Sequence, residues 1–506
     1  PSNGIKDTIT YDLQRSTINI QFIDAKTNQN VITIDNQIKV IIVGESKSAI
    51  ADIIGAPNEE YIVRNGFLTL TILPEFTPSN SSPIRFSILY QLENYISSSK
   101  EITITNDGDY IVKIQMVNEE DPPDGVSVRK LYGLGNLYNG VLFDDVTISS
   151  TNGYANVTIP SGTKLMDIDT NNLSGKLNIS LVYYDGQADD AFSSMPGGVA
   201  SSILKNNNIS TVVFFNAGII GIEIYDVDFR KAVFIEEKSI EIDMHVPTGI
   251  FNPETGSNIK LGDEILLFTY ISDTGLWYYG GMTKVEASNL GGLHITTSKT
   301  NIGTYNFSNY SEVSCNNGSV FEIAGDCQQC GSIMLDGTVR KQRDNSFVSN
   351  ISLAASWNQP SKTTFTTGNV GVYIDWLGPT VCKPCGVDPT IVPLLIDNMC
   401  SQQTIKLPLI DFGGVTASIT ANFSGVCASD TNIVILPSFG VWIRHTDSDC
   451  WRWASMKNGQ SKICNLVYDE SYIIGTYYNG IWKEWEILIS DETIYDFYLD
   501  FPAATC

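Results

Sequence analysis

Residues 100–117 read KEITITNDGDYIVKIQMV, and this stretch decides the fold class. Ile102 and Ile104 alternate with threonines, and Asn106–Asp109 then supplies a turn. The return segment, Tyr110–Met116, alternates again between apolar and other residues. Alternation with a period of two on both sides of a short turn predicts two β-strands joined as a hairpin.

The same pattern recurs near the end of the chain, where residues 480–502 read GIWKEWEILISDETIYDFYLDFP. Both stretches have a Lys-Glu pair, an alternating strand, a turn with acidic residues and a second alternating strand. Residues 361–376, SKTTFTTGNVGVYIDW, form a weaker third copy. Domains that close with one pattern predict related β-sandwiches. We therefore expect an all-β chain, a string of Ig-like or transthyretin-like β-sandwich domains.

Length and composition predict how this string is divided. A chain of 506 residues with only 17% charged residues is long enough for three or four domains rich in strands and turns. The stretch EEDPPDG holds two prolines, four acids and a glycine, which excludes it from a sheet interior. The predicted divisions are an N-terminal β-sandwich over 1–118, a linker over 119–125, a central β domain over 126–310, a small cysteine-containing β domain over 311–398 and a C-terminal disulfide-bonded β-sandwich over 399–506.

The net charge limits the possible partners. A formal charge of −25 repels phosphate backbones and anionic lipid surfaces, and no run of Lys and Arg offsets it locally. Nucleic acid is therefore a poor candidate partner. The sequence also lacks any window near the roughly 18 consecutive apolar residues of a transmembrane helix.

Ten cysteines, an even number, all lie in the last two fifths of the chain, which favours about five disulfides formed in an oxidising compartment. The disulfide candidates are Cys315, Cys327, Cys330, Cys382, Cys385, Cys400, Cys427, Cys450, Cys464 and Cys506. We expect Cys450 to pair with Cys464 or Cys427, and Cys400 with Cys506. Two CxxC units could instead bind zinc, but 51 residues separate them, which exceeds the usual spacing of a zinc ribbon.

Catalytic signatures are scarce. The three histidines form no HExxH motif or close pair, and the sequence has no G-x-S-x-G elbow, P-loop or G-x-G-x-x-G. Acid pairs such as Asp189-Asp190 could serve glycoside hydrolysis, yet 56 acidic residues make adjacent acids common by chance. We therefore expect a protein that is not an enzyme and that needs no cofactor.

One loop is a candidate for a structural calcium ion. In DIDTNNLSGKLN, residues 167–178, the oxygen-bearing residues Asp167, Asp169 and Asn171 alternate as calcium ligands do. The stretch departs from the EF-hand pattern, because Asn172 replaces the turn glycine and Asn178 replaces the bidentate glutamate. An ordinary turn rich in Asn and Asp is the alternative reading.

Aromatic residues are candidates for sugar binding, because planar rings stack on sugar faces. Trp451 and Trp453, in CWRW, are two of them. The third is Tyr278 in residues 262–281, GDEILLFTYISDTGLWYYGG. The alternative is that such rings fill sandwich cores. Both faces of the strand within 262–281 are apolar, which predicts a central strand with mostly buried aromatics and leaves Tyr278 for binding.

Residues 244–281, MHVPTGIFNPETGSNIKLGDEILLFTYISDTGLWYYGG, carry a resemblance to a known family. Asn252–Gly256, Gly262-Asp263 and Asp273–Gly275 match motifs of large surface-exposed outer-membrane lipoproteins of the Bacteroidota. The preceding MPGGVA, residues 195–200, resembles the same family's FPGG loop. Residues 16–117 look like its carboxypeptidase-regulatory or transthyretin-like sandwich, and residues 400–506 resemble another sandwich of that kind.

The resemblance implies location and architecture. Such proteins are exported, lose a signal peptide, are acylated on an N-terminal cysteine and are displayed on the cell surface. A lipidated cysteine would then precede Pro1, and lipid instead of a transmembrane helix would anchor the chain. The family has no catalytic motif to carry over to this sequence.

These observations lead to a functional expectation. We expect a non-enzymatic accessory or scaffold subunit of an outer-membrane complex, with an outer-membrane β-barrel or other surface lipoproteins as partners. The complex could be a SusC/SusD-like importer or a machine for outer-membrane protein insertion or secretion. A glycan-binding surface module is the alternative, and an extracellular hydrolase is the weaker third reading.

Overall fold

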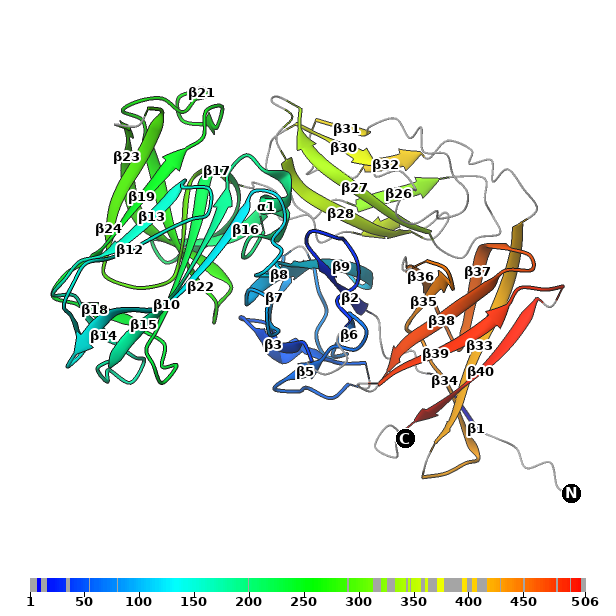
Figure 1. Cartoon of the computed structure of the whole chain (residues 1–506). Coiled ribbons are helices and arrows are strands. Elements are labelled where there is room, and N and C mark those ends of the chain that lie inside the picture. The colour runs from blue at the N-terminus through cyan, green and yellow to red at the C-terminus, as the bar shows by residue number, and fades with distance from the viewer. Residues whose placement is uncertain are drawn as a thin grey trace, which may run out of the picture. The chain divides into compact units, whose positions relative to one another are not determined.

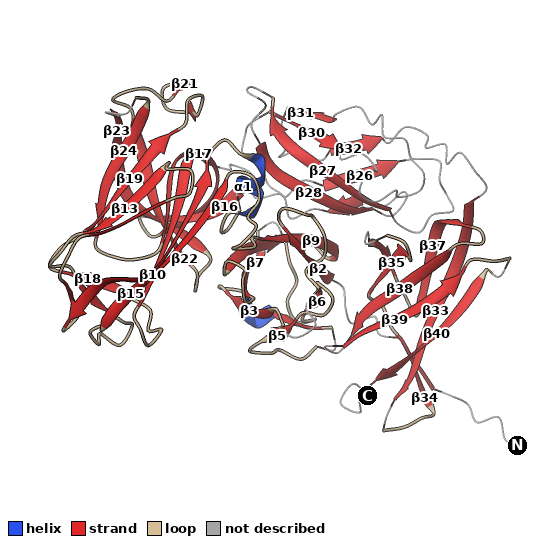
Figure 2. Cartoon of the chain, in the orientation of Figure 1, coloured by secondary structure: helices blue, strands red, loops and turns tan. Residues whose placement is uncertain are grey.

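The chain is described by a computed structural model whose secondary structure is almost entirely β (Figures 1 and 2). The described residues are 7–10, 16–32, 37–53, 55–79, 81–198, 200–288, 291–312, 320–324, 333–342, 345, 347–355, 360–362, 371–376, 394–397, 403–406, 416–427, 429–448, 451–478, 481–491 and 493–501. The expected all-β string of domains is confirmed. One short α-helix, α1 (Asp189–Ser194), lies within the described part.

The chain forms two compact units, each described by itself. Unit 1 comprises residues 1–93, 102–115 and 314–506, and unit 2 comprises residues 94–101 and 116–313. Unit 1 therefore contains the two ends of the sequence. The domains predicted in sequence order do not anticipate that the first and last parts of the chain belong to one unit. Strand pairing and side-chain packing bring together segments that are distant in sequence.

The N-terminal sandwich has two four-stranded sheets. One has the order β4 (Ile50–Asp52), β6 (Phe67–Ile72), β2 (Ser16–Asp24) and β9 (Gly108–Met116), and the other has β5 (Tyr61–Ile62), β3 (Lys39–Val43), β7 (Ile84–Gln91) and β8 (Ser98–Ile104). Ile18, Ile20 and Phe22 of β2 are fully buried in its core.

The hairpin predicted at residues 100–117 is wrong in its pairing. Both strands form, but β8 pairs with β7 and β9 belongs to the other sheet, so the turn is an arch between two sheets. The second copy is also an arch, because β39 (Ile481–Leu488) and β40 (Ile494–Phe501) lie in different sheets. Alternation fixes which face of a strand is apolar, and it does not fix which neighbour the strand pairs with.

The C-terminal sandwich repeats the N-terminal topology. One sheet has the order β36 (Arg452–Ser455), β35 (Gly440–His445), β38 (Ser471–Tyr478) and β39, which matches β5-β3-β7-β8. In the other sheet, β33 (Thr416–Cys427) pairs with β37 (Gln460–Val467) and β40, as β2 is flanked by β6 and β9. β34 (Ile433–Leu436) and β1 (Asp7–Thr10) extend this second sheet.

The same turn occurs at equivalent places in the two sandwiches. Asn65-Gly66 and Asn458-Gly459 both adopt positive φ, at 51° and 79° in the first and 48° and 73° in the second. The N–H of Phe22 donates to the Gly66 carbonyl at 2.7 Å, and the N–H of Phe423 donates to the Gly459 carbonyl at 2.6 Å. Matching pairings, turns and hydrogen bonds indicate that the two sandwiches are structural repeats.

A smaller pair of sheets lies between them in sequence. The first has the order β29 (Pro360–Lys362), β26 (Val320–Ala324) and β32 (Gln403–Lys406), and the second has β28 (Phe347–Ala355), β27 (Ile333–Lys341), β30 (Val372–Trp376) and β31 (Leu394–Ile396). The third copy of the pattern, residues 361–376, thus also spans two sheets. β32 lies beyond the predicted boundary at residue 398, and β1 lies outside the N-terminal sandwich, because each completes the edge of a sheet built elsewhere in the sequence.

Unit 2 is built on a 14-stranded sheet. Its order is β12 (Val146–Ser149), β13 (Ala155–Ile159), β19 (Ile240–Val246), β24 (Leu293–Lys299), β23 (Leu276–Ala287), β22 (Glu264–Ile271), β25 (Thr304–Glu312), β17 (Asn208–Tyr225), β15 (Gly175–Asp185), β10 (Val126–Tyr138), β11 (Val141–Leu142), β14 (Lys164–Met166) and β18 (Phe234–Glu236), with β16 (Ala200–Lys205) on β17 and β23. One core cluster contains residues from both ends of this order, so the sheet folds over on itself. β22 pairs on both sides, as the apolar pattern of residues 262–271 predicts.

Candidate functional site

An aromatic cluster joins the N-terminal and C-terminal sandwiches within unit 1. Phe67, at the start of β6, has its ring centroid 4.4 Å from that of Trp442, 4.7 Å from that of Trp482 and 5.7 Å from that of Trp451. The Trp482 ring stacks on Phe67 at an interplanar angle of 12°. Trp453 and Ile111 complete the cluster. We call these six residues the Phe67 cluster.

Sequence pattern explains how the C-terminal sandwich presents this cluster. Alternate residues of β35 and β38 face opposite sides of the sheet. Val441, Ile443 and Ile474 lie in the core of the C-terminal sandwich, whereas Trp442 lies in the Phe67 cluster. Gly475 has no side chain, and a Cβ built there would lie 2.2 Å from Cζ2 of Trp482. The glycine therefore lets the indole ring lie flat on β38, where it reaches Phe67.

Hydrogen bonds accompany the aromatic contacts. The Tyr477 hydroxyl donates to the carbonyl of Ile62 at 2.7 Å, and burial raises the pKa of this hydroxyl. The Ser455 hydroxyl donates to the Asp109 carboxylate at 3.2 Å. The other carboxylate oxygen of Asp109 accepts a hydrogen bond from Thr17 at 2.6 Å. The Asp109 carboxylate therefore accepts hydrogen bonds from both sandwiches, from Thr17 of the first and Ser455 of the second.

The structure places two of the candidate sugar-binding residues in the Phe67 cluster. Trp451 is 5% exposed and Trp453 is 4% exposed, so neither ring offers a face to solvent. The Arg444 guanidinium lies 5.2 Å from the Trp451 ring centroid. The sequence CWRW therefore contains two tryptophans that pack between two domains.

Tyr278, the third candidate, lies on β23 in unit 2 and is half-buried. Its neighbours in register are Thr269 of β22 and Leu204 of β16. The adjacent Trp277 is fully buried, and its ring centroid lies 4.9 Å from that of Tyr270. Tyr278 therefore belongs to unit 2, whereas Trp451 and Trp453 belong to unit 1.

The candidate calcium loop is held by an arginine. The Asp167 carboxylate accepts hydrogen bonds from the N–H groups of Asp169 and Asn171 at 3.0 Å and 2.8 Å, which closes the loop on itself. Arg230 lies 3.6 Å from Asp167 and 2.6 Å from Asp226. The guanidinium thus supplies a positive charge where the prediction places an ion, and the side-chain amide of Asn171 donates to the Asp167 carboxylate at 3.3 Å. A calcium ion held by Asp167, Asp169 and Asn171 remains a prediction.

The Asp226 carboxylate is fully buried, and its pKa differs from the usual value. Burial alone would raise the pKa of Asp226. Hydrogen bonds from the backbone N–H groups of Arg230, Ser174 and Asp228, and from the Arg230 guanidinium, outweigh this effect and lower the pKa below its usual value. The carboxylate is therefore ionised and structural.

The motifs that carry the family resemblance also have structural roles. Asn252, which is 1% exposed, donates to the Asp263 carboxylate at 3.2 Å and accepts from Asn309 at 3.0 Å. Gly275 adopts a φ of 70° in the turn before Trp277. These residues fix the turns that flank β22.

The MPGG loop packs against residues 94–101 of unit 2. The N–H of Gly197 donates to the Ser99 carbonyl at 3.1 Å, and a Cβ built at Gly198 would lie 3.0 Å from Nζ of Lys100. Burial lowers the pKa of Lys100, and the neighbouring Glu101 charge partly opposes this shift. Glu101 accepts a hydrogen bond from the Ser202 hydroxyl at 2.6 Å.

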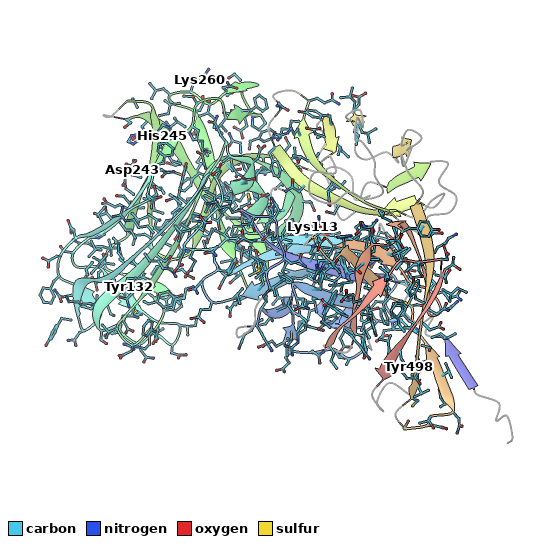
Figure 3. All side chains as sticks on the ribbon, turned by 45° about the vertical axis from the view of Figure 1, so that its right-hand side comes forward. Lys113, Tyr132, Asp243, His245, Lys260 and Tyr498 are labelled. Carbon is cyan, nitrogen blue, oxygen red and sulfur yellow. The ribbon has the colours of Figure 1, made fainter. Side chains whose placement is uncertain are left out.

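Two of the three histidines are register partners on neighbouring strands, His245 of β19 opposite His294 of β24, and the third, His445, lies on β35. His294 lies 2.8 Å from Asp243, His445 lies 2.9 Å from Glu470, and His245 packs on Tyr154 with ring centroids 5.0 Å apart. Asp243 and His245 are two residues apart on β19 (Figure 3). Within the described ranges, no three His, Cys, Asp or Glu side chains are placed to hold one metal ion.

The acid pair Asp189-Asp190 lies at the start of α1. Burial raises the pKa of Asp190, and the negative charges of Asp124 and Asp189 raise it further. Asp124 is thus a further carboxylate near this pair at the start of α1. A role of the pair in glycoside hydrolysis stays a hypothesis.

Cys427 is the one cysteine whose side chain the structure describes. It is buried at the end of β33 and is disulfide-bonded. The backbone of Cys464 lies in β37, while its side chain and the other eight cysteines lie outside the described residues. The predicted pairings, Cys450 with Cys464 or Cys427 and Cys400 with Cys506, therefore remain predictions.

Comparisons with known proteins show no family. No model of a protein family matches the sequence, and no curated protein matches it. Similar solved structures include the Bacillus anthracis TIE protein, at 10% identity over 76% of both chains with a TM-score of 0.15.

Two pilin subunits are also similar. They are BcpA, the major pilin subunit of Bacillus cereus, at 8% identity over 96% of this chain and 98% of that chain with a TM-score of 0.15, and the full-length major pilin RrgB of Streptococcus pneumoniae, at 8% identity over 96% and 99% with a TM-score of 0.13. TM-scores this low show no shared arrangement of domains, so no property of these proteins is transferred to this chain. In the part of the chain that the structure describes, no helix is long and apolar enough to cross a membrane.

Proposed function

We propose that the chain is a non-enzymatic, multidomain β protein of the cell surface that serves as an accessory or scaffold subunit of an outer-membrane complex. The Phe67 cluster is the observation that carries the proposal. Trp442, Trp451 and Trp453 are each at most 5% exposed, and with Trp482 they contact the N-terminal sandwich. Trp451 and Trp453, the tryptophans expected to be candidates for sugar binding, thus help to join two domains.

A scaffold must present its surfaces in a fixed relation, and this junction has the means to do so. Small polar interfaces between domains usually permit relative motion. Here stacked rings and the hydrogen bond from Tyr477 to Ile62 fix both position and orientation. In this proposal, the two repeated sandwiches joined in this way act as one body that presents surfaces to partners.

The resemblance of residues 244–281 to surface lipoproteins of the Bacteroidota supports the proposed location. On that basis the anchor is a lipid, and the partner is an outer-membrane β-barrel or another surface lipoprotein. A SusC/SusD-like importer and a machine for outer-membrane protein insertion or secretion are the two kinds of complex proposed.

Affinity purification from native membranes in mild detergent, read by mass spectrometry, tests the proposal. We expect one or more partners in stoichiometric amounts. Trp482→Ala should reduce partner recovery, since it loosens the Phe67 cluster. Tyr498→Ala is the matched control, because it truncates an aromatic residue of the same sandwich that is 50% exposed and outside the cluster. Recovery of a lone monomer contradicts the proposal.

A further inference from the structure

The first described strand of the chain pairs with its last domain. β1 runs parallel to β34, with Asp7 opposite Ile433 and Thr10 opposite Leu436. Among the described pairings, β1 has no other partner and takes no part in the sheets of the N-terminal sandwich. β1 is therefore a separate strand that closes the edge of a sheet formed by distant residues.

The acceptor strand would otherwise be an open edge. β34 reads IVIL, and Ile435 is 1% exposed within the core of the C-terminal sandwich. Its other side pairs with β33 at only two positions, Gly425 with Ile435 and Val426 with Val434. An apolar edge strand with unpaired N–H and C=O groups readily accepts an added strand.

The donor strand is short and is joined to the next strand by a short segment. Only residues 11–15 separate β1 from β2, and they bridge at most roughly 20 Å. The ladder contains four residue pairs, so its hydrogen bonds hold the strand weakly. A strand of identical sequence from another molecule would form the same ladder without any new contact.

We propose that β34 is a strand-acceptor site and that copies of this chain associate when β1 of one copy pairs with β34 of another. Each copy carries one donor and one acceptor, so the exchange yields closed dimers or open chains. The formal charge of −25 opposes the approach of two copies, and salt should therefore promote association. The proposal does not depend on the scaffold function.

A fluorescent peptide of residues 3–13, NGIKDTITYDL, tests the acceptor site. The receptor is the full chain with Thr8→Pro and Ile9→Pro. Neighbouring residues of a strand aim their N–H groups to opposite sides, so the pair of prolines removes one N–H directed at β34. We expect the peptide to bind this receptor at least about tenfold more tightly than a peptide with the same two prolines, as measured by anisotropy.

Light scattering on the full chain tests whether copies of the chain associate. The mass of the unaltered chain should rise with protein concentration and with salt, and the double-proline chain should stay monomeric. Near-ultraviolet circular dichroism checks that this variant keeps its fold. Equal binding of the two peptides, or no binding, overturns the acceptor site. An unaltered chain that is monomeric at every concentration and salt overturns association by strand exchange.

Discussion

Asp226 and Arg230 fix two loops of unit 2. The Arg230 guanidinium contacts Asp226 at 2.6 Å and Asp167 at 3.6 Å, while Asp226 also accepts hydrogen bonds from its own loop. A buried carboxylate with several donors is stable only when ionised. This group should therefore link the stability of unit 2 to pH.

Replacing Asp226 by asparagine should lower the free energy of unfolding of unit 2 by roughly 2–4 kcal/mol at neutral pH, because the charge-assisted hydrogen bonds are lost. The folded-state pKa lies below the usual value of 3.8. The contribution is therefore complete above the unfolded-state pKa and is lost as the pH falls through the lower folded-state pKa. Urea unfolding over a pH series should show the two proteins converging in stability at acidic pH.

Asp228→Asn is the control for this change. Asp228 lies two residues away on the same loop and is exposed, so the same change of charge should alter stability by less than about 0.5 kcal/mol. Equal losses in the two variants would show that net charge, and not the buried hydrogen bonds of Asp226, accounts for the effect.

Gly475 should be intolerant of even a methyl group. A Cβ at this position would lie 2.2 Å from the Trp482 ring, so Gly475→Ala should displace the indole from Phe67 and cost about 1–3 kcal/mol. Gly303→Ala is the matched control, since its Cβ would meet only Cγ2 of Thr269, at 3.9 Å. Tryptophan fluorescence and thermal unfolding would report both changes, and equal stability of the two variants would contradict this role for Gly475.

At the scale of elements, the two Asn-Gly turns give a direct test of the repeat. Gly66 and Gly459 both have positive φ, and a Cβ would lie 3.0 Å from the Phe22 carbonyl oxygen in the first and 2.4 Å from the Phe423 carbonyl oxygen in the second. Alanine at either position should cost about 1–3 kcal/mol, with the larger loss at Gly459.

Gly256→Ala separates the two causes of that loss, the positive φ and the close contact of the added Cβ with a carbonyl oxygen. Gly256 has a φ of 67°, but a Cβ there meets nothing within 4 Å. Its loss should be about 1 kcal/mol, which reflects backbone conformation alone. Denaturant unfolding of the three variants would measure the difference, and a loss at Gly459 no larger than that at Gly256 would contradict a close approach of the backbones.

The positions of strands could be predicted from the sequence, but their pairing partners could not. Alternation at residues 100–117 locates β8 and β9, and the same pattern at 480–502 locates β39 and β40. Each pair crosses between two sheets, because an amphipathic strand can complete any sheet edge that offers the right face. Local sequence encodes that face, whereas the available edge depends on strands elsewhere in the chain.

At the scale of the whole molecule, the junction within unit 1 was beyond prediction from local pattern. The sequence of β2, STINIQFID, alternates as a strand with one wet face does, yet Thr17 and Asn19 are buried as completely as Ile18 and Ile20. Asn19 accepts a hydrogen bond from Thr69 at 3.3 Å. Polar residues are tolerated there because partners distant in sequence satisfy them, and alternation carries no sign of those partners.

The same reasoning applies to the aromatic residues. Trp451 and Trp453 read equally well as a sugar platform and as core residues when only CWRW is considered. Their burial depends on Phe67, a residue near the other end of the chain. The sequence pattern identified Trp451 and Trp453 as candidates. Their contact with Phe67, which shows that they pack between domains, is seen only in the folded chain.

The Phe67 cluster should make the two end sandwiches unfold together, which leads to a prediction for Trp482. Trp482→Ala removes the ring stacked on Phe67 and its edge contact with Trp451, at 5.4 Å between centroids. The coupling between the two sandwiches should fall by roughly 2–3 kcal/mol, and the single calorimetric transition of unit 1 should separate into two.

Trp485→Ala distinguishes this effect from general damage. Trp485 packs on Phe423 and Phe497, at centroid distances of 5.8 Å and 5.1 Å, inside the C-terminal sandwich. Its truncation should lower the unfolding temperature of unit 1, while the Phe67 cluster keeps both sandwiches in one unfolding transition. If Trp482→Ala leaves one transition and Trp485→Ala separates it, the sandwiches are coupled through the interior of the C-terminal domain, and the rigidity that the scaffold proposal requires does not come from the cluster.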